Sequence, residues 1–134
     1  MHKTTFGSNK LAMRITDSNT VRSLQIAFTS VYPNLKLEFF KVSKQGGKIT
    51  TTVKLDPSTR LGDVRKVHNN GFIKLDDKIT VNGLVTTLHE VFGLYAVVYR
   101  NSFDTWRPLR PSDKGTLREH DLRGFLSNQR LQID

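Results

Sequence analysis

A helix, a stop and a strand follow one another in a single stretch of the chain: Thr80-Val81-Asn82-Gly83-Leu84-Val85-Thr86-Thr87-Leu88-His89-Glu90-Val91-Phe92-Gly93-Leu94-Tyr95-Ala96-Val97-Val98-Tyr99-Arg100. Apolar residues recur at helical spacing from Val81 to Phe92, and Thr80 is of a residue type that caps helix N-termini. Gly93 suits the left-handed backbone conformation that ends many helices. The β-branched and aromatic residues from Leu94 onward predict a strand.

The same pattern occurs earlier, between Thr20 and Lys41. When Thr20 is placed on Thr80, the apolar positions of the two helices coincide, and after a gap of one residue those of the two strands coincide as well. Pro57-Ser58 and Pro111-Ser112 then follow at corresponding places. We interpret the match as an internal duplication, although any two units of a helix and a strand would share part of this pattern.

The flanking residues complete two units of strand, helix, strand and strand. Residues 10–16 alternate between apolar and polar side chains, which predicts the first strand. Gln45-Gly46-Gly47 predicts a hairpin turn between strands over Leu35–Lys44 and Lys48–Leu55, because glycine tolerates the positive φ of such turns. A short helical turn is expected within residues 61–67.

The second unit repeats this order. Strands are expected over Gly71–Leu75, Leu94–Asn101 and Thr105–Arg110, and Pro108 is typical of an edge strand or of a short one. A short helix or turn is expected over Thr116–Phe125, with Leu117, Leu122 and Phe125 inward.

These elements predict one α+β domain over residues 1–134. We expect a two-layer sandwich made from a duplicated β-α-β-β unit, with about six strands and two main helices on one face. The first repeat covers residues 10–67 approximately, and the second covers residues 71–125 approximately. The strand residues expected to face the helices are Leu11, Met13, Ile15, Leu35, Leu37, Phe39, Leu94, Ala96 and Val98.

The run Thr80–Arg100 followed by Trp106, with Thr20-Val21-Arg22-Ser23-Leu24-Gln25 before it, resembles a set of small uncharacterised bacterial proteins built from two such repeats. The resemblance spans residues 20–125 approximately and consists of apolar and turn positions. It implies a fold, and it implies no activity and no catalytic residue.

The charge of the chain is distributed unevenly. The net charge is +9, and residues 1–75 hold 13 Lys/Arg against 4 Asp/Glu while residues 76–134 hold 8 against 8. A basic half favours anionic partners such as nucleic acid, and it is also compatible with a solvated surface. The chain has no cysteine, no run of 18 apolar residues and no apolar signal core, so we expect a cytoplasmic protein that does not span a membrane.

Sequence motifs for catalysis, cofactors or metals are not found. None of the four histidines has the spacing of a metal pair, and the glycines do not form a phosphate-binding loop. The tripeptide Glu119-His120-Asp121 could be drawn as an acid–base cluster, but adjacent residues rarely converge on one substrate, and a solvated polar turn is expected instead. We therefore expect a non-enzymatic protein with no catalytic residue, cofactor or metal.

The face of the sheet that points away from the helices is the candidate binding face. It combines aromatic, aliphatic and basic side chains: Lys36, Phe40, Lys44, Tyr95, Val97, Tyr99 and Trp106. Exposed apolar surface of this extent is seldom left bare. Residues 61–67 and 117–125 could cover it, a protein partner or a second copy could bind it, or single-stranded nucleic acid could stack on it.

A candidate basic patch overlaps this face and consists of Lys36, Lys41, Lys44, Lys48, Arg65 and Lys66. The sequence thus favours a small interaction module that binds a protein or itself through a sheet face or edge. Nucleic-acid binding by the basic half is the first alternative, and an enzyme of unknown class is the second. No small-molecule substrate is implied.

Overall fold

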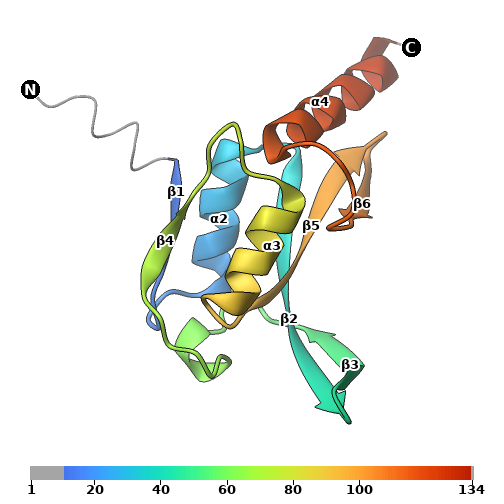
Figure 1. Ribbon diagram of the computed structural model, residues 1–134. Helices are drawn as coiled ribbons and strands as arrows, with labels where there is room; N and C mark the ends of the chain where they lie inside the picture. The colour runs from blue at the N-terminus through green and yellow to red at the C-terminus, as the bar shows by residue number, and fades with distance from the viewer. Residues whose placement is uncertain (1–10, 134) are drawn as a thin grey trace, which may run out of the picture.

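The computed structural model describes residues 11–133, so the expected start of the first strand at Lys10 lies outside the described residues. Two successive groups of elements have the same order of strand, helix, strand and strand (Figure 1). The first group is β1 (Ala12–Ile15), α2 (Val21–Val31), β2 (Leu35–Gln45) and β3 (Lys48–Lys54). After the short 3-10 turn η1 (Leu61–Asp63), the second is β4 (Gly71–Lys74), α3 (Val81–Glu90), β5 (Tyr95–Ser102) and β6 (Thr105–Leu109), followed by α4 (Leu117–Ile133). The expected α+β class is confirmed.

The six strands form two sheets. Strands β3-β2-β5-β6 make a four-stranded antiparallel sheet, and β1 pairs with β4 in a separate two-stranded sheet. Helices α2 and α3 lie side by side against the larger sheet, with the β1–β4 pair beside α2 (Figure 1). The β2–β3 hairpin extends from one end of the molecule and α4 from the other (Figure 1).

The strand pairing in both sheets has an internal symmetry. If every residue is replaced by the residue at the corresponding position of the other half, pairs of each sheet become other pairs of the same sheet. In the small sheet, the pair Ala12–Lys74 becomes the pair Arg14–Phe72, which is also present. In the large sheet, the pair Lys36–Tyr99 becomes Phe40–Tyr95, which is likewise present. The halves are thus related by an approximate twofold arrangement of their backbone pairing.

Both main helices begin and end where the sequence signals predict. Thr20 Oγ1 accepts a hydrogen bond from Ser23 N at 3.3 Å, and Thr80 Oγ1 accepts one from Gly83 N at 3.0 Å. Gly93 has φ +70°, and its N–H donates to His89 O at 3.0 Å, so the glycine closes α3 as expected.

The core lies between α2, α3 and the inner face of the large sheet, and it includes the inner residues of the small sheet. Eight of the nine predicted inward strand residues are buried, and the exception is Leu11, which is 38% exposed at the beginning of the described chain. Leu61 and Leu117, which follow the two hairpins, also enter this core.

The C-terminal helix differs from the expectation. α4 has 17 residues, and within residues 117–129 its buried positions are Leu117, His120, Asp121 and Gly124, whereas Leu122 and Phe125 are exposed. A Cβ atom on Gly124 would come within 2.8 Å of Asn101 O, so the absence of a side chain lets this face of the helix lie against β5. The helices of the described residues include none that is both long and apolar enough to cross a membrane.

Candidate functional site

The outer face of the four-stranded sheet, opposite α2 and α3, carries the predicted binding residues. In β2 and β5 the fully buried residues alternate with half-buried ones, because successive side chains of a strand point to opposite faces. The half-buried residues include Phe40, Tyr95, Val97 and Tyr99. Of the two segments proposed to cover this face, each contributes its leucine, Leu61 or Leu117, to the core on the helix side.

Lysine side chains lie over the aromatic rings of this face. Lys36 Nζ is 4.7 Å from the centre of the Trp106 ring and 5.5 Å from that of Tyr99. Lys44 Nζ is 5.6 Å from the centre of the Tyr95 ring. Such cation–π contacts are attractive, because the electron-rich face of the ring attracts the ammonium group. The structure therefore brings all the residues of the candidate binding face onto one surface.

A groove of about 360 Å³ runs from one end of this surface around the β5 edge to α3, and we call it the outer-face groove. It extends from the hairpin to α3, and its apolar lining includes Phe40, Val42, Ile49, Val85, Tyr95 and Val97. The His89 and Tyr95 rings, 4.4 Å apart between their centres, lie within it. β6 pairs with β5 only from Val98 onward, so the β5 edge at residues 95–97 is not paired with β6 beside the groove.

A β-bulge shapes the hairpin wall of the groove. Ser43 pairs with Thr51 and Lys44 pairs with Ile49, so Thr50 is an extra residue in β3. The extra residue shifts the alternation, and Ile49 thereby shares the outer face with Lys44.

A second cavity of about 450 Å³ lies at the base of the hairpin, and we call it the hairpin-base pocket. It shares Phe40, Val42, His89 and Tyr95 with the outer-face groove. Its other lining residues are Lys41, Lys44, Leu55, Val64, Lys66, Val67, Gly93 and Leu94.

The predicted basic patch is only partly assembled. Lys41, Lys44 and Lys66 meet at the hairpin-base pocket, and Lys48 lies on the exposed hairpin. Lys36 lies on the outer face, where its Nζ atom is 3.7 Å from Glu38 Oε2 and also faces the aromatic rings. Arg65, the sixth predicted member, is buried and only 3% exposed, so it is separated from solvent ligands.

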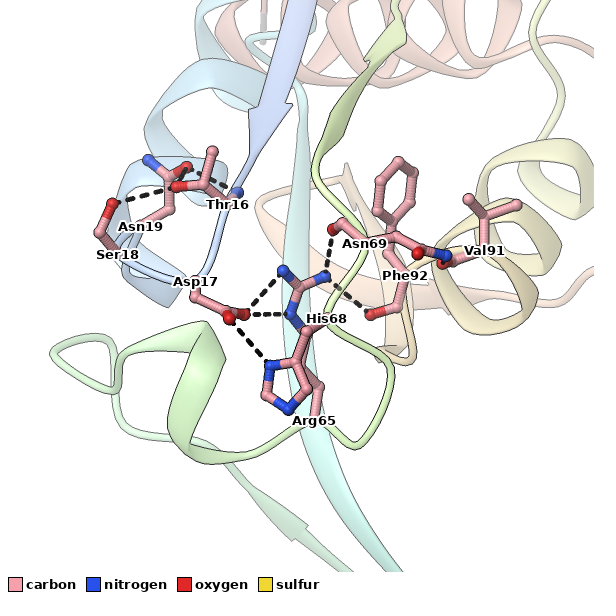
Figure 2. A network of polar contacts seen from close by, with 9 residues as sticks. All are labelled: Thr16, Asp17, Ser18, Asn19, Arg65, His68, Asn69, Val91 and Phe92. Atoms are coloured by element: carbon pink, nitrogen blue, oxygen red, sulfur yellow. Dashed lines mark hydrogen bonds and ion pairs between the residues drawn. The ribbon is translucent and has the colours of Figure 1, made fainter.

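Arg65 instead holds three segments of the chain together, as Figure 2 shows. Its Nε and Nη2 atoms lie 2.9 and 2.8 Å from Asp17 Oδ1, in the loop before α2. Its Nη1 atom donates to Asn69 O at 2.8 Å and to Phe92 O at 3.2 Å, at the end of α3. His68 Nδ1 lies 2.9 Å from Asp17 Oδ2. The network fixes the 61–69 segment that carries Val64, Lys66 and Val67 to the wall of the hairpin-base pocket.

The pKa of Asp17 reflects this network. Desolvation of the carboxyl group acts to raise its pKa, but the hydrogen bonds and charges of Arg65 and His68 outweigh that effect and hold the pKa below its usual value. The sequence predicts Arg65 in a surface patch. Its burial could not be read from the sequence, because its partner Asp17 is 48 residues away and no local pattern connects the two.

The three residues Glu119, His120 and Asp121 have separate structural contacts. Glu119 accepts a hydrogen bond from Thr116 N at 2.8 Å, and its own N–H donates to Thr116 Oγ1 at 3.1 Å, which is a capping box at the start of α4. Asp121 Oδ1 accepts from Asn34 N at 2.7 Å. These contacts do not converge on a common substrate position.

His120 is buried rather than solvated, in contrast to the polar turn expected from the sequence. Its Nδ1 accepts a hydrogen bond from Arg100 Nη1 at 3.1 Å, which fixes the ring as a neutral acceptor. Burial lowers the pKa of His120, and the positive charges of Arg100 and Arg123 lower it further.

Comparison with protein-family models, with curated proteins and with solved structures gave no significant match for this chain. Among the described residues, no group of three or more His, Asp or Glu side chains is placed to hold a metal ion. The geometry of the outer face and of its two cavities is therefore the basis on which function is inferred.

Proposed function

We propose that this protein is a non-enzymatic binding module that engages another protein through the outer face of its four-stranded sheet. One observation carries the proposal: Phe40, Tyr95, Tyr99 and Trp106 gather on that face together with the apolar outer-face groove. Tyr, Trp and Phe are enriched in the anchoring centres of protein interfaces.

The charge of the surface indicates which kind of protein it would bind. The β2–β3 hairpin and its base carry Lys36, Lys41, Lys44, Lys48 and Lys54, and Glu38 is the one carboxylate in residues 35–54. A partner that presents acidic side chains around apolar ones would match this surface.

Self-association through the same face would bring like charges together. In a symmetric dimer each patch meets its own copy, so the lysines of both hairpins would approach one another. We therefore expect a monomer by light scattering at physiological ionic strength, across a range of protein concentrations. A concentration-dependent dimer mass that disappears in Tyr99→Asp would replace the proposal with self-association.

The proposal is tested by placing a photo-crosslinking amino acid at Val97, in the outer-face groove, and at Thr29, an exposed position of α2, as control. We expect a discrete crosslinked product from position 97 in the native cells, and none of that size from position 29. The partner is then purified and must bind the isolated protein. Equal products from both positions, or a partner that does not bind in purified form, would refute the proposal.

Nucleic-acid binding is a second candidate, favoured by the exposed Lys41, Lys44 and Lys48 of the hairpin. Bases would have to stack on rings that the Lys36 and Lys44 ammonium groups already face, which makes this candidate weaker. Binding of single-stranded DNA that falls steeply with salt, and that is lost when Lys41, Lys44 and Lys48 are changed to Glu, would support it. Absence of binding at low salt would exclude it.

We also infer that the two halves arose from one duplicated strand-helix-strand-strand unit. The shared element order, the exchangeable sheet registers and the matching Thr20 and Thr80 caps support this origin. The outer face spans both halves, so a partner bound there would contact the central strands of each.

A further inference from the structure

The hairpin-base pocket adjoins the proposed protein-binding face, and it adds a set of residues that lie outside that face. These additional residues include the apolar Leu55, Val64, Val67 and Leu94 and the basic Lys41 and Lys66, and Lys44 also lines the pocket. A volume of about 450 Å³ lies within the range of roughly 300–1,000 Å³ that is typical of small-molecule sites.

The positive charge at this pocket is not compensated by the chain. None of the pocket's lining residues is Asp or Glu, and Lys41, Lys44 and Lys66 form no ion pair within the described residues. Glu38 pairs with Lys36 and Lys54 instead. Lys44 faces the Tyr95 ring, and all three lysines are free of ion pairs with the part of the chain that the structure describes, so their charge is available to an external anion.

The C-terminus of α3 lies near the pocket, and helix C-termini carry a partial negative charge that repels anions. This repulsion is reduced here, because the terminal carbonyl groups have hydrogen-bond donors. The terminal carbonyl of Val91 accepts a hydrogen bond from Asn69 Nδ2 at 2.7 Å, and that of Phe92 accepts one from Arg65. The network of Figure 2 thus satisfies these carbonyls and at the same time fixes the wall that carries Lys66.

The second half of the molecule shows what occupies the corresponding space there. In the correspondence between the halves, Arg100 is the equivalent of Lys41, and His120 is the equivalent of Val64. In the second half, Arg100 is hydrogen-bonded to His120, and Gly124 of α4 lies against Asn101, so the chain fills this space itself. In the first half, Lys41 is exposed and no helix equivalent to α4 follows the hairpin, so the pocket is open.

We propose that the hairpin-base pocket binds a small organic anion in which a carboxylate or phosphate group is joined to an apolar or aromatic body. The anionic group is held by the lysines that line the pocket, whose ammonium groups act as point charges. The apolar body lies against Leu55 and Leu94 and is removed from water. This ligand site borders the outer-face groove and shares Phe40 and Tyr95 with it, but Tyr99 and Trp106 do not line it.

Nuclear magnetic resonance titration with three probes tests the chemistry of the site. The probes are 4-phenylbutyrate, its uncharged analogue 4-phenylbutan-1-ol, and acetate, which lacks the apolar body. We expect saturable amide shifts at Lys66, Val67 and Leu94 with phenylbutyrate, and an affinity for the alcohol that is about tenfold lower or weaker still. Acetate is expected to produce no saturable shift at these amides. Equal affinities for phenylbutyrate and the alcohol, or no saturation by about 10 mM phenylbutyrate, would overturn the proposal.

Two lysine variants locate the site. Lys66→Met keeps an unbranched side chain of similar size and removes its charge, so we expect phenylbutyrate affinity to fall about fivefold or more. Lys74→Met, on the exposed side of β4, is the matched control and should leave the affinity unchanged. Equal losses in the two variants would show a nonspecific effect of net charge and would refute the site. Tyr99→Asp should leave phenylbutyrate binding intact, so failure of this site and failure of the outer-face proposal are distinguishable.

Discussion

At the scale of single residues, two arginine side chains connect parts of the chain that are distant in sequence. Arg65 joins the loop before α2 to the end of α3, and Arg118 has a similar role in the other half. Arg118 Nε lies 3.3 Å from Asp77 Oδ1, and its Nη1 donates to Val31 O at 3.2 Å, at the end of α2. Each arginine thus ties an aspartate before one helix to the last residues of the other helix.

Replacement of Arg65 tests this role. Arg65→Met removes the donors to Asn69 O and Phe92 O and leaves these carbonyls without their charged partner. We expect a loss of about 2–4 kcal/mol in the free energy of unfolding, measured in urea. Arg22→Met, at an exposed position of α2, is the control and should change stability by less than about 0.5 kcal/mol. A similarly small effect of Arg65→Met would show that the network is not structural.

His120 gives the stability a pH dependence of known sign. Its folded-state pKa is lowered by burial and by the positive charges of Arg100 and Arg123, so the unfolded chain binds a proton first as the pH falls. The contribution of neutral, buried His120 to the free energy of unfolding is fully present above the unfolded pKa of about 6.5 and is lost progressively below it. We expect His120→Gln to flatten the fall in unfolding free energy between about pH 7 and 5. An unchanged slope in this variant would contradict the assignment.

At the scale of elements, α4 depends on a close approach to the sheet. Alanine in place of glycine normally stabilises a helix interior by about 1 kcal/mol. In Gly124→Ala the new Cβ would lie 2.8 Å from Asn101 O and 2.9 Å from Asn34 Cβ, so we expect destabilisation instead, by about 1–3 kcal/mol. Thermal unfolding compared with Thr29→Ala, an exposed helical position, provides the measurement. A gain in stability for Gly124→Ala would show that α4 does not pack as described.

Local sequence signals were sufficient for most elements and insufficient for their long-range arrangement. The Thr20 and Thr80 caps, the Gly93 stop and the glycine turn of the first hairpin are local, and each of them is found. The division of six strands into two sheets depends on pairing between distant segments, as in β1 with β4. The sequence predicts only a short helix or turn over residues 116–125, with Leu122 and Phe125 inward. Both side chains are exposed on α4, so the apolar pattern of this segment does not follow the buried face of the helix.

The candidate site was predictable to a similar extent. Strand alternation alone placed Phe40, Tyr95 and Tyr99 on one face, because the period of a strand is fixed. The bulge that brings Ile49 to the same face could not be deduced, since it depends on the register of β3 against β2. The burial of Arg65 was equally inaccessible, because it depends on contacts with Asp17 and with the end of α3.

At the scale of the whole molecule, the first half carries the excess charge and contributes all three lysines of the open pocket, while the second half closes the corresponding space with α4. The outer face crosses both halves through β2 and β5. We therefore propose that the two cavities have different roles: the outer-face groove contributes to protein binding, and the hairpin-base pocket, whose lysines all come from the first half, binds an anion.

The most direct test of the outer face as the binding surface is the dissociation constant of the partner crosslinked at position 97, measured with purified proteins for two aspartate variants. Val97→Asp places a charge in the apolar groove, and we expect the affinity to fall about tenfold or more with the fold retained. Thr29→Asp, on the exposed side of α2, should leave the dissociation constant unchanged. A dissociation constant for Val97→Asp equal to that of the unmodified protein would contradict the account.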